Sequence, residues 1–118
     1  MRRILKQLNE HAGIRGSIVV THDGMVVASC LDQRLNEEKV AAMASTVISS
    51  VRRSLKGNGL SKFHRLTLKA GYGKLVFRDT GIAYLVVVMD RNFDPGPTEI
   101  EVESARMRIK ALGEMQVG

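Results

Sequence analysis

The sequence lacks most of the residues around which small proteins build disulfides, stacking platforms and membrane spans. Its 118 residues include one cysteine, so no disulfide can form within the chain. Tryptophan is absent and aromatic residues make up only 4% of the chain, which leaves few rings for single-stranded nucleic acid to stack on. No apolar run is long enough to cross a membrane, and polar residues interrupt any signal-peptide core near the N-terminus. We therefore expect a cytoplasmic protein without membrane insertion.

Residues that could carry out chemistry are present, but they form no catalytic or metal-binding pattern. No HxxxH or CxxC spacing favours a metal site. Ser45 and Ser49 have no predicted base to activate them, and Cys30 has no histidine beside it, which favours a small buried residue over a reactive thiol. The segment Gly71-Tyr72-Gly73-Lys74 lacks the ending of a phosphate-binding loop and precedes a strand, so it predicts a hairpin turn. We expect no metal, no cofactor and no enzymatic activity.

The net charge is +6 and the sequence pI is near 9.9, which makes nucleic acid or an acidic protein a candidate partner. The chain has no zinc-finger spacing, aromatic RNA-binding motif or recognition-helix signature. The cations are also spread over most predicted elements, so nucleic acid is disfavoured. They include Arg2, Arg3, Lys6, Arg52, Arg53, Lys56, Lys62, Arg65, Lys69, Arg106, Arg108 and Lys110.

Hydrophobic periodicity and turn signals predict one domain over residues 1–118, with three helices and five strands. The helices are expected at 2–12, at 36–56 and from Thr98 onward, and the strands at 17–21, 25–30, 63–69, 74–79 and 82–89. Asp23-Gly24 predicts a hairpin between the first two strands, and Thr98 with Glu101 forms a capping box. Short connections between strands favour a mostly antiparallel sheet with helices on both faces, a mixed α/β (α+β) fold.

The burial of individual strands also follows from their patterns. Residues 18–20 and 85–88 are continuously apolar, which predicts strands covered on both faces. Segment 63–69 alternates instead, with Leu66 and Leu68 on one side and Arg65, Thr67 and Lys69 on the other. This pattern predicts a half-exposed strand at the edge of the sheet.

The helix at 36–56 carries two stripes at helical spacing, which is the most informative feature of the chain. The apolar stripe consists of Val40, Met43, Val47, Val51 and Leu55, and the second of Ala42, Ser45, Ser49, Arg52 and Lys56. Because small side chains let another backbone approach closely, the second stripe favours a helix packed between its own sheet and a partner. Ala and Ser are also tolerated on any helix surface, so an ordinary solvent face remains the alternative.

Four short motifs, in this order and spacing, resemble one family from end to end of the chain. They are Gly13-Ile14-Arg15-Gly16-Ser17-Ile18-Val19-Val20, then Asp23-Gly24 with Val26-Val27-Ala28-Ser29, then Ala41-Ala42-Met43-Ala44, and finally Gly81 before a hydrophobic strand. The family is Roadblock, which includes the Roadblock dynein light chains and bacterial MglB-type regulators.

The resemblance implies a five-stranded antiparallel sheet between helices. It also implies a homodimer in which the edge strand 63–69 pairs with its twin and the long helices meet. Such domains resemble platforms for small Ras-like GTPases. In MglB-type members the dimer acts as a GTPase-activating protein that reorganises the GTPase's own catalytic residues, without inserting an arginine.

Our leading hypothesis is therefore a dimeric regulator or binding platform for a small Ras-like GTPase. The expected dimer and partner interface consists of Ala42, Ser45, Ser49, Arg52 and Arg53 on the helix and Arg65, Thr67 and Lys69 along the paired edge. The alternative is a nucleotide-independent structural adaptor in a motor or signalling complex. An enzyme or small-ligand binder and a nucleic-acid binder are weaker hypotheses, motivated only by the fold type and the net charge.

Overall fold

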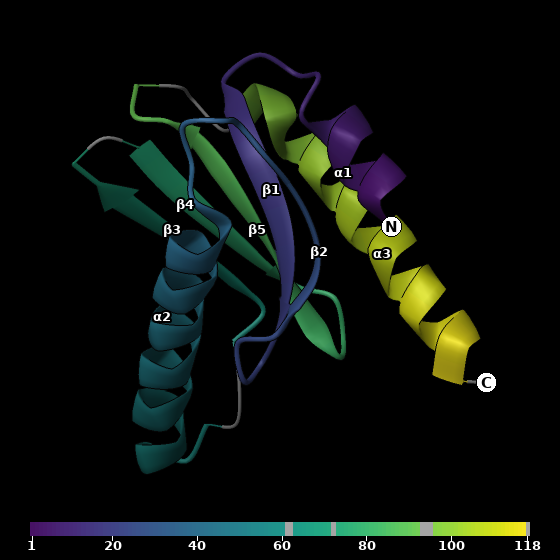
Figure 1. Ribbon diagram of the computed structural model, residues 1–118. Coiled ribbons are helices and arrows are strands. Elements are labelled where there is room, and N and C mark those ends of the chain that lie inside the picture. Colours follow the sequence, from purple (N-terminus) through teal and green to yellow (C-terminus); the bar gives the residue numbers. More distant parts are fainter. Residues whose placement is uncertain (61–62, 72, 93–95, 118) are drawn as a thin grey trace.

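The computed structural model describes residues 1–60, 63–71, 73–92 and 96–117. Its elements follow the predicted order, with a short 3-10 turn added before the last helix (Figure 1). They are α1 (Arg2–Leu8), β1 (Ile14–Thr21), β2 (Val26–Leu31), α2 (Glu37–Gly57), β3 (Arg65–Ala70), β4 (Gly73–Asp79), β5 (Ala83–Asp90), η1 (Gly96–Thr98) and α3 (Glu99–Val117). Tyr72 of the predicted turn and residues 93–95 of the loop before the last helix lie outside the described residues.

The five strands form one antiparallel sheet in the order β2-β1-β5-β4-β3. Helix α2 covers one face, and α1 and α3 cover the other (Figure 1). Central strand β5 and residues 18–20 of β1 are buried on both faces, as their continuous apolar runs predicted. Strand β3 lies at the edge, where its alternating pattern placed it, and the two-sided sandwich confirms the predicted fold class.

The sheet separates two hydrophobic cores. The core on the α1 and α3 side takes the odd-numbered residues of β5 and Val76 of β4, together with Val102, Ala105 and Ile109 of α3. The core on the α2 side takes the even-numbered residues of β5, with Leu75 and Phe77 of β4. Strands β1, β4 and β5 therefore contribute to both cores through their alternating side chains, whereas the leucines of β3 contribute only to the α2-side core.

The first helix is shorter than predicted. It ends at Leu8, and the side chain of the C-cap residue Asn9 links the helix end to the first two strands. The Asn9 amide donates to the Cys30 carbonyl at 2.6 Å, and its side-chain oxygen accepts a hydrogen bond from the Ser17 hydroxyl at 2.8 Å. Cys30 beside it is half-buried. Strand β1 accordingly begins at Ile14, earlier than the predicted residue 17.

The apolar stripe of α2 is rotated from the predicted one. Val40, Ala41, Ala44 and Ile48 are the buried residues, whereas Met43, assigned to the core from its spacing, is 41% exposed. Stripes through residue 43 and through residue 44 differ by only about 100° around a helix, and both satisfy the spacing. The sheet contacts the one with two alanines, and Val47, Val51 and Leu55 pack half-buried beside it.

Side-chain contacts fix where α2 and β3 begin. The Asn36 side chain accepts a hydrogen bond from the Lys39 amide at 3.0 Å, which is the predicted N-cap of α2. Before β3, the buried Tyr84 hydroxyl donates to the Phe63 carbonyl at 2.7 Å and the two rings stack at 4.7 Å. These contacts fix the point at which the chain enters the edge strand. Within the described ranges, no helix is both long and apolar enough to cross a membrane.

Substitution of Gly24 tests how closely the β1–β2 turn packs against α2. Its φ is +92°, and a Cβ there would lie 2.6 Å from Ser45 Oγ. Gly81 also has a positive φ of +104°, but a Cβ there would meet no described atom within 4 Å beyond its chain neighbours. We expect Gly81→Ala to lower the free energy of unfolding by about 1–2 kcal/mol through φ alone. Gly24→Ala should cost about 1–3 kcal/mol more through the added clash.

Urea unfolding of both variants, and of Gly24→Ala in a Ser45→Gly background, measures the two costs separately. The Ser45→Gly background should bring the cost of Gly24→Ala close to that of Gly81→Ala. Equal costs for the two alanine variants in the wild-type background would contradict a close contact between the turn and α2.

Candidate interaction surfaces

The predicted interface residues of α2 differ in how accessible they are. Ala42, Ser49 and Arg53 are exposed, so they are available to a partner. Ser45 and Arg52 are half-buried, and Ser45 lies against Gly24 of the β1–β2 turn. Ser45 is therefore part of the packing of the domain on itself, which the spacing of small residues could not reveal.

Ser45 also fixes which side of α2 faces which edge of the sheet. The β1–β2 turn lies at the end of the sheet order opposite to β3. Met43, Val47, Ser50 and Ser54 lie about 140–180° around the helix from Ser45, so this flank is turned toward the β3 edge. Of these residues, Met43, Ser50 and Ser54 are exposed and Val47 is half-buried. We call them the β3-side flank of α2.

Strand β3 places its predicted interface residues on the other face of the sheet. The register aligns Arg65 with Arg78, Thr67 with Val76, and Lys69 with Lys74. Val76 belongs to the core beneath α1 and α3, so Arg65, Thr67 and Lys69 share that face, whereas Leu66 and Leu68 pack toward α2. The eight predicted interface residues therefore occupy two opposite faces that meet only at the β3 edge.

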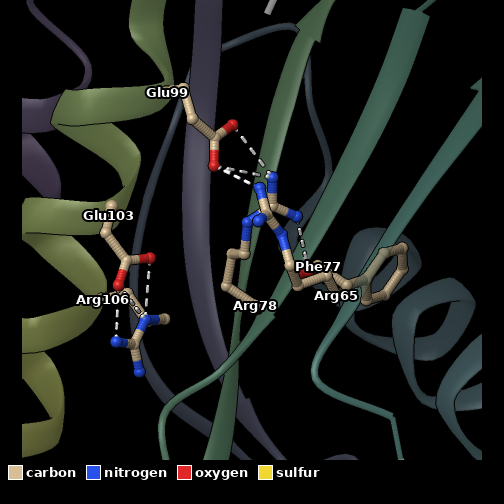
Figure 2. Close-up of polar contacts among 6 residues, drawn as sticks. All are labelled: Arg65, Phe77, Arg78, Glu99, Glu103 and Arg106. Carbon is tan, nitrogen blue, oxygen red and sulfur yellow. Dashed lines mark hydrogen bonds and ion pairs between the residues drawn. The ribbon is translucent and has the colours of Figure 1, made fainter.

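On the α3 side, one carboxylate bridges two arginines that oppose each other across β3 and β4. Glu99, in the first turn of α3, accepts hydrogen bonds from Arg65 and from Arg78, the latter at 3.2 Å (Figure 2). The Arg78 side chain is only 5% exposed and also donates to the Phe77 carbonyl at 2.9 Å. Burial lowers the pKa of Arg78, an effect that the charge of Glu99 opposes.

A second ion pair lies one turn further along α3. Arg106 donates to both oxygens of Glu103 at 2.6 to 3.0 Å (Figure 2) and to the Asp79 carbonyl at 3.4 Å. The hydrogen bond from Arg106 lowers the pKa of Glu103, and the same bond raises the pKa of Arg106. His64 Nδ1 lies 3.3 Å from an Asp79 oxygen at the start of this surface.

Sequence reasoning missed Arg78, Glu99 and Glu103, and it counted Arg106 only as a surface cation. The available signal was Arg78, a cation that directly follows the apolar run Leu75-Val76-Phe77. Such a residue needs a carboxylate partner once it is buried. Which carboxylate supplies it depends on how α3 crosses the sheet. In the part of the chain that is described, no three His, Cys, Asp or Glu side chains gather as a metal site would require.

Comparison with known proteins identifies relatives over the full fold. The Roadblock/LC7 domain family matches residues 2–89. An uncharacterized protein of Methanocaldococcus jannaschii is 36% identical over 110 residues, which cover 93% of both chains. Among solved structures, MglB of Myxococcus xanthus superposes with a TM-score of 0.86 at 16% identity, covering 97% of this chain and 87% of that one. A Roadblock/LC7 domain from Streptomyces avermitilis gives 0.80 at 18% identity, covering 100% and 98%.

Replacing Glu99 and Glu103 with glutamine compares the two ion pairs under matched chemistry. Glu99→Gln leaves the buried Arg78 without its charged partner and should lower the free energy of unfolding by about 1–3 kcal/mol. Glu103→Gln affects a pair whose side chains are 43% and 24% exposed, so it should cost less than about 1 kcal/mol. Urea unfolding at neutral pH measures both, and an equal cost would mean that the burial of Arg78 does not depend on Glu99.

Proposed function

Because the chain belongs to the Roadblock/LC7 family, we propose that it forms a homodimer that binds a small Ras-like GTPase and regulates its nucleotide cycle. The observation that carries the dimer is the edge strand β3, whose six residues pair with β4 on one side. An edge strand left in water is open to pairing with another chain. A twin β3 related by two-fold symmetry would satisfy this edge and extend the sheet across the dimer.

The side chains around β3 suit such a pairing. Leu66 and Leu68 are only half-buried by α2, so apolar surface remains beside the edge on that face. The exposed Met43 on the β3-side flank of α2 adds to it. In a two-fold dimer the same surfaces of both copies would cover one another, which supports contact between the two α2 helices through this flank.

The outer face of α2 would then remain free for the GTPase. Ala42 and Ser49 are small and exposed, and Arg52 and Arg53 follow one turn later. Small side chains allow a close approach, and the two cations complement an acidic surface and speed encounter. As the resemblance to MglB-type regulators implies, the protein would act by reorganising catalytic groups that belong to the GTPase.

Two arginine substitutions on α2 distinguish dimerisation from partner binding. Met43→Arg places a charge on the β3-side flank and should convert a dimer of twice the 13.0 kDa chain mass into monomers. Ala42→Arg lies on the outer face and should leave the dimer intact. Multi-angle light scattering measures the masses, and circular dichroism checks folding. A wild-type monomer at high concentration, or a Met43→Arg dimer, would overturn the proposed pairing.

Affinity capture from the source-cell lysate, with excess GTP analogue or excess GDP, tests for the GTPase. The tagged protein should enrich a Ras-like GTPase only with the GTP analogue, and Ala42→Arg should lose it because the added side chain blocks close approach. The remaining binding should weaken as ionic strength rises. Capture of the same proteins with both nucleotides would contradict nucleotide sensing and favour the adaptor function.

A further inference from the structure

A groove of about 840 Å³ lies between α3 and the β3–β4 edge, on the face of the sheet opposite α2. Its floor and walls include Arg65, Arg78, Glu99, Ile100, Glu103 and Met107. The outer half of the β3–β4 hairpin extends beyond the part of the sheet that α1 and α3 cover (Figure 1). The groove shares Arg65 with the proposed dimer edge, and the outer face of α2 contributes nothing to its lining.

The floor of the groove concentrates positive charge in an unfavourable arrangement. Arg65 lies directly opposite Arg78 in the floor, and further along the same face, outside the lining of the groove, Lys69 lies opposite Lys74. Like charges directly opposed across an antiparallel pair are destabilising. The Glu99 carboxylate is shared between the two arginines (Figure 2). Nε of the buried Arg78 has no hydrogen-bond partner among the described residues.

The wall of the groove includes exposed apolar side chains of α3, at positions where an exposed helix surface is ordinarily polar. Ile100 is 78% exposed and Met107 is 57% exposed, and they are two turns apart on one side of α3. Both line the groove together with the arginines. A ligand that fills it must therefore offer negative charge to the strands and apolar surface to the helix.

We propose that this groove binds an extended acidic segment of a partner protein. A carboxylate of the segment would lie over Arg65 and Arg78, competing with Glu99, and a neighbouring apolar side chain would pack on Ile100 and Met107. Four arginines and three carboxylates line the groove, and Lys69 and Lys74 lie beside it. This balance is complementary to acidic peptide. The concave shape and apolar wall favour a peptide over a flat lipid surface or a nucleic-acid backbone.

Because the groove and α2 lie on opposite faces, the acidic segment and the GTPase could be bound at the same time. The inference therefore does not depend on the proposed GTPase. It would make the domain a bridge between two partners, one on each face of its sheet.

A labelled peptide provides the test. The probe is a fluorescein-labelled peptide of alternating glutamate and leucine, and the matched peptides alternate glutamine with leucine and glutamate with serine. Fluorescence anisotropy with the full chain should show binding of the first peptide, with weaker binding of both matched peptides. Amide shifts in NMR spectra should localise to residues 65–69 and 99–107.

Three charge variants decide whether the groove is responsible. Arg65→Ser with Lys69→Ser should weaken binding about tenfold, because two charged contacts are lost. The matched control, Arg34→Ser with Lys56→Ser, removes one arginine and one lysine from exposed sites on the α2 side and should leave the affinity unchanged. Glu99→Gln should tighten binding by about threefold, because it removes the competing carboxylate.

A double variant, Ile100→Ser with Met107→Ser, removes the apolar wall and should weaken binding of the peptide. It tests the groove independently if Glu99→Gln fails to fold. If the control variant at Arg34 and Lys56 lost as much affinity as the Arg65 and Lys69 variant, the effect would come from net charge alone and the proposal would be overturned. Binding of phosphatidylserine vesicles or duplex DNA without binding of the acidic peptide would overturn it as well. GTPase capture by the Arg65 and Lys69 variant, measured separately, shows whether the face formed by α2 still functions.

Discussion

Burial of the central strand on both faces is the constraint on which the rest of the structure depends. The residues of β5 from Ala83 to Met89 are all buried, so apolar side chains leave the strand in both directions and each face of the sheet must be covered. Helix α2 covers one face, and α1 with α3 covers the other. Three helices of these lengths leave the β3–β4 side of the sheet incompletely covered on its α3 face. The groove follows from that, whereas the open edge follows from the place of β3 at the end of the strand order.

The alternation of β3 then determines how the surface chemistry is distributed. Odd-numbered residues carry charge to the α3 face, and even-numbered leucines carry apolar surface to the α2 face. A strand with two such different sides can join a twin through its backbone while its side chains serve separate surfaces. In the proposed dimer the apolar side would face the twin copy beside α2, while the charged side forms part of the floor of the groove beside α3.

Glu99 connects the fold to this charged surface. It begins α3, where a carboxylate is favoured by the helix dipole, and it pairs with both of the arginines that the strand register forces together. A ligand carboxylate could therefore replace it without creating a new charge imbalance on the strands. The position of the helix start, rather than a catalytic constellation, makes this surface responsive to an acidic partner.

The sequence by itself determined the element order, the two-sided sheet, the central strand and the edge strand. These follow from local patterns: continuous apolar runs at 18–20 and 85–88, alternation at 63–69, and Asn36 before the long helix. The sequence also placed Ala42, Ser49 and Arg53 on an accessible part of that helix, and the family resemblance agrees with the Roadblock/LC7 match.

Only the tertiary structure decided which of two apolar stripes α2 buries, because stripes through Met43 and Ala44 satisfy the same period and the sheet contacts the one with smaller side chains. It also decided that Ser45 packs against Gly24 and that Arg65 and Arg78 both form ion pairs with Glu99. Residues 78 and 99 are brought together by the register of β3 on β4 and by the path of α3 across the sheet. Local periodicity carries no information about either, because both depend on contacts between elements distant in sequence.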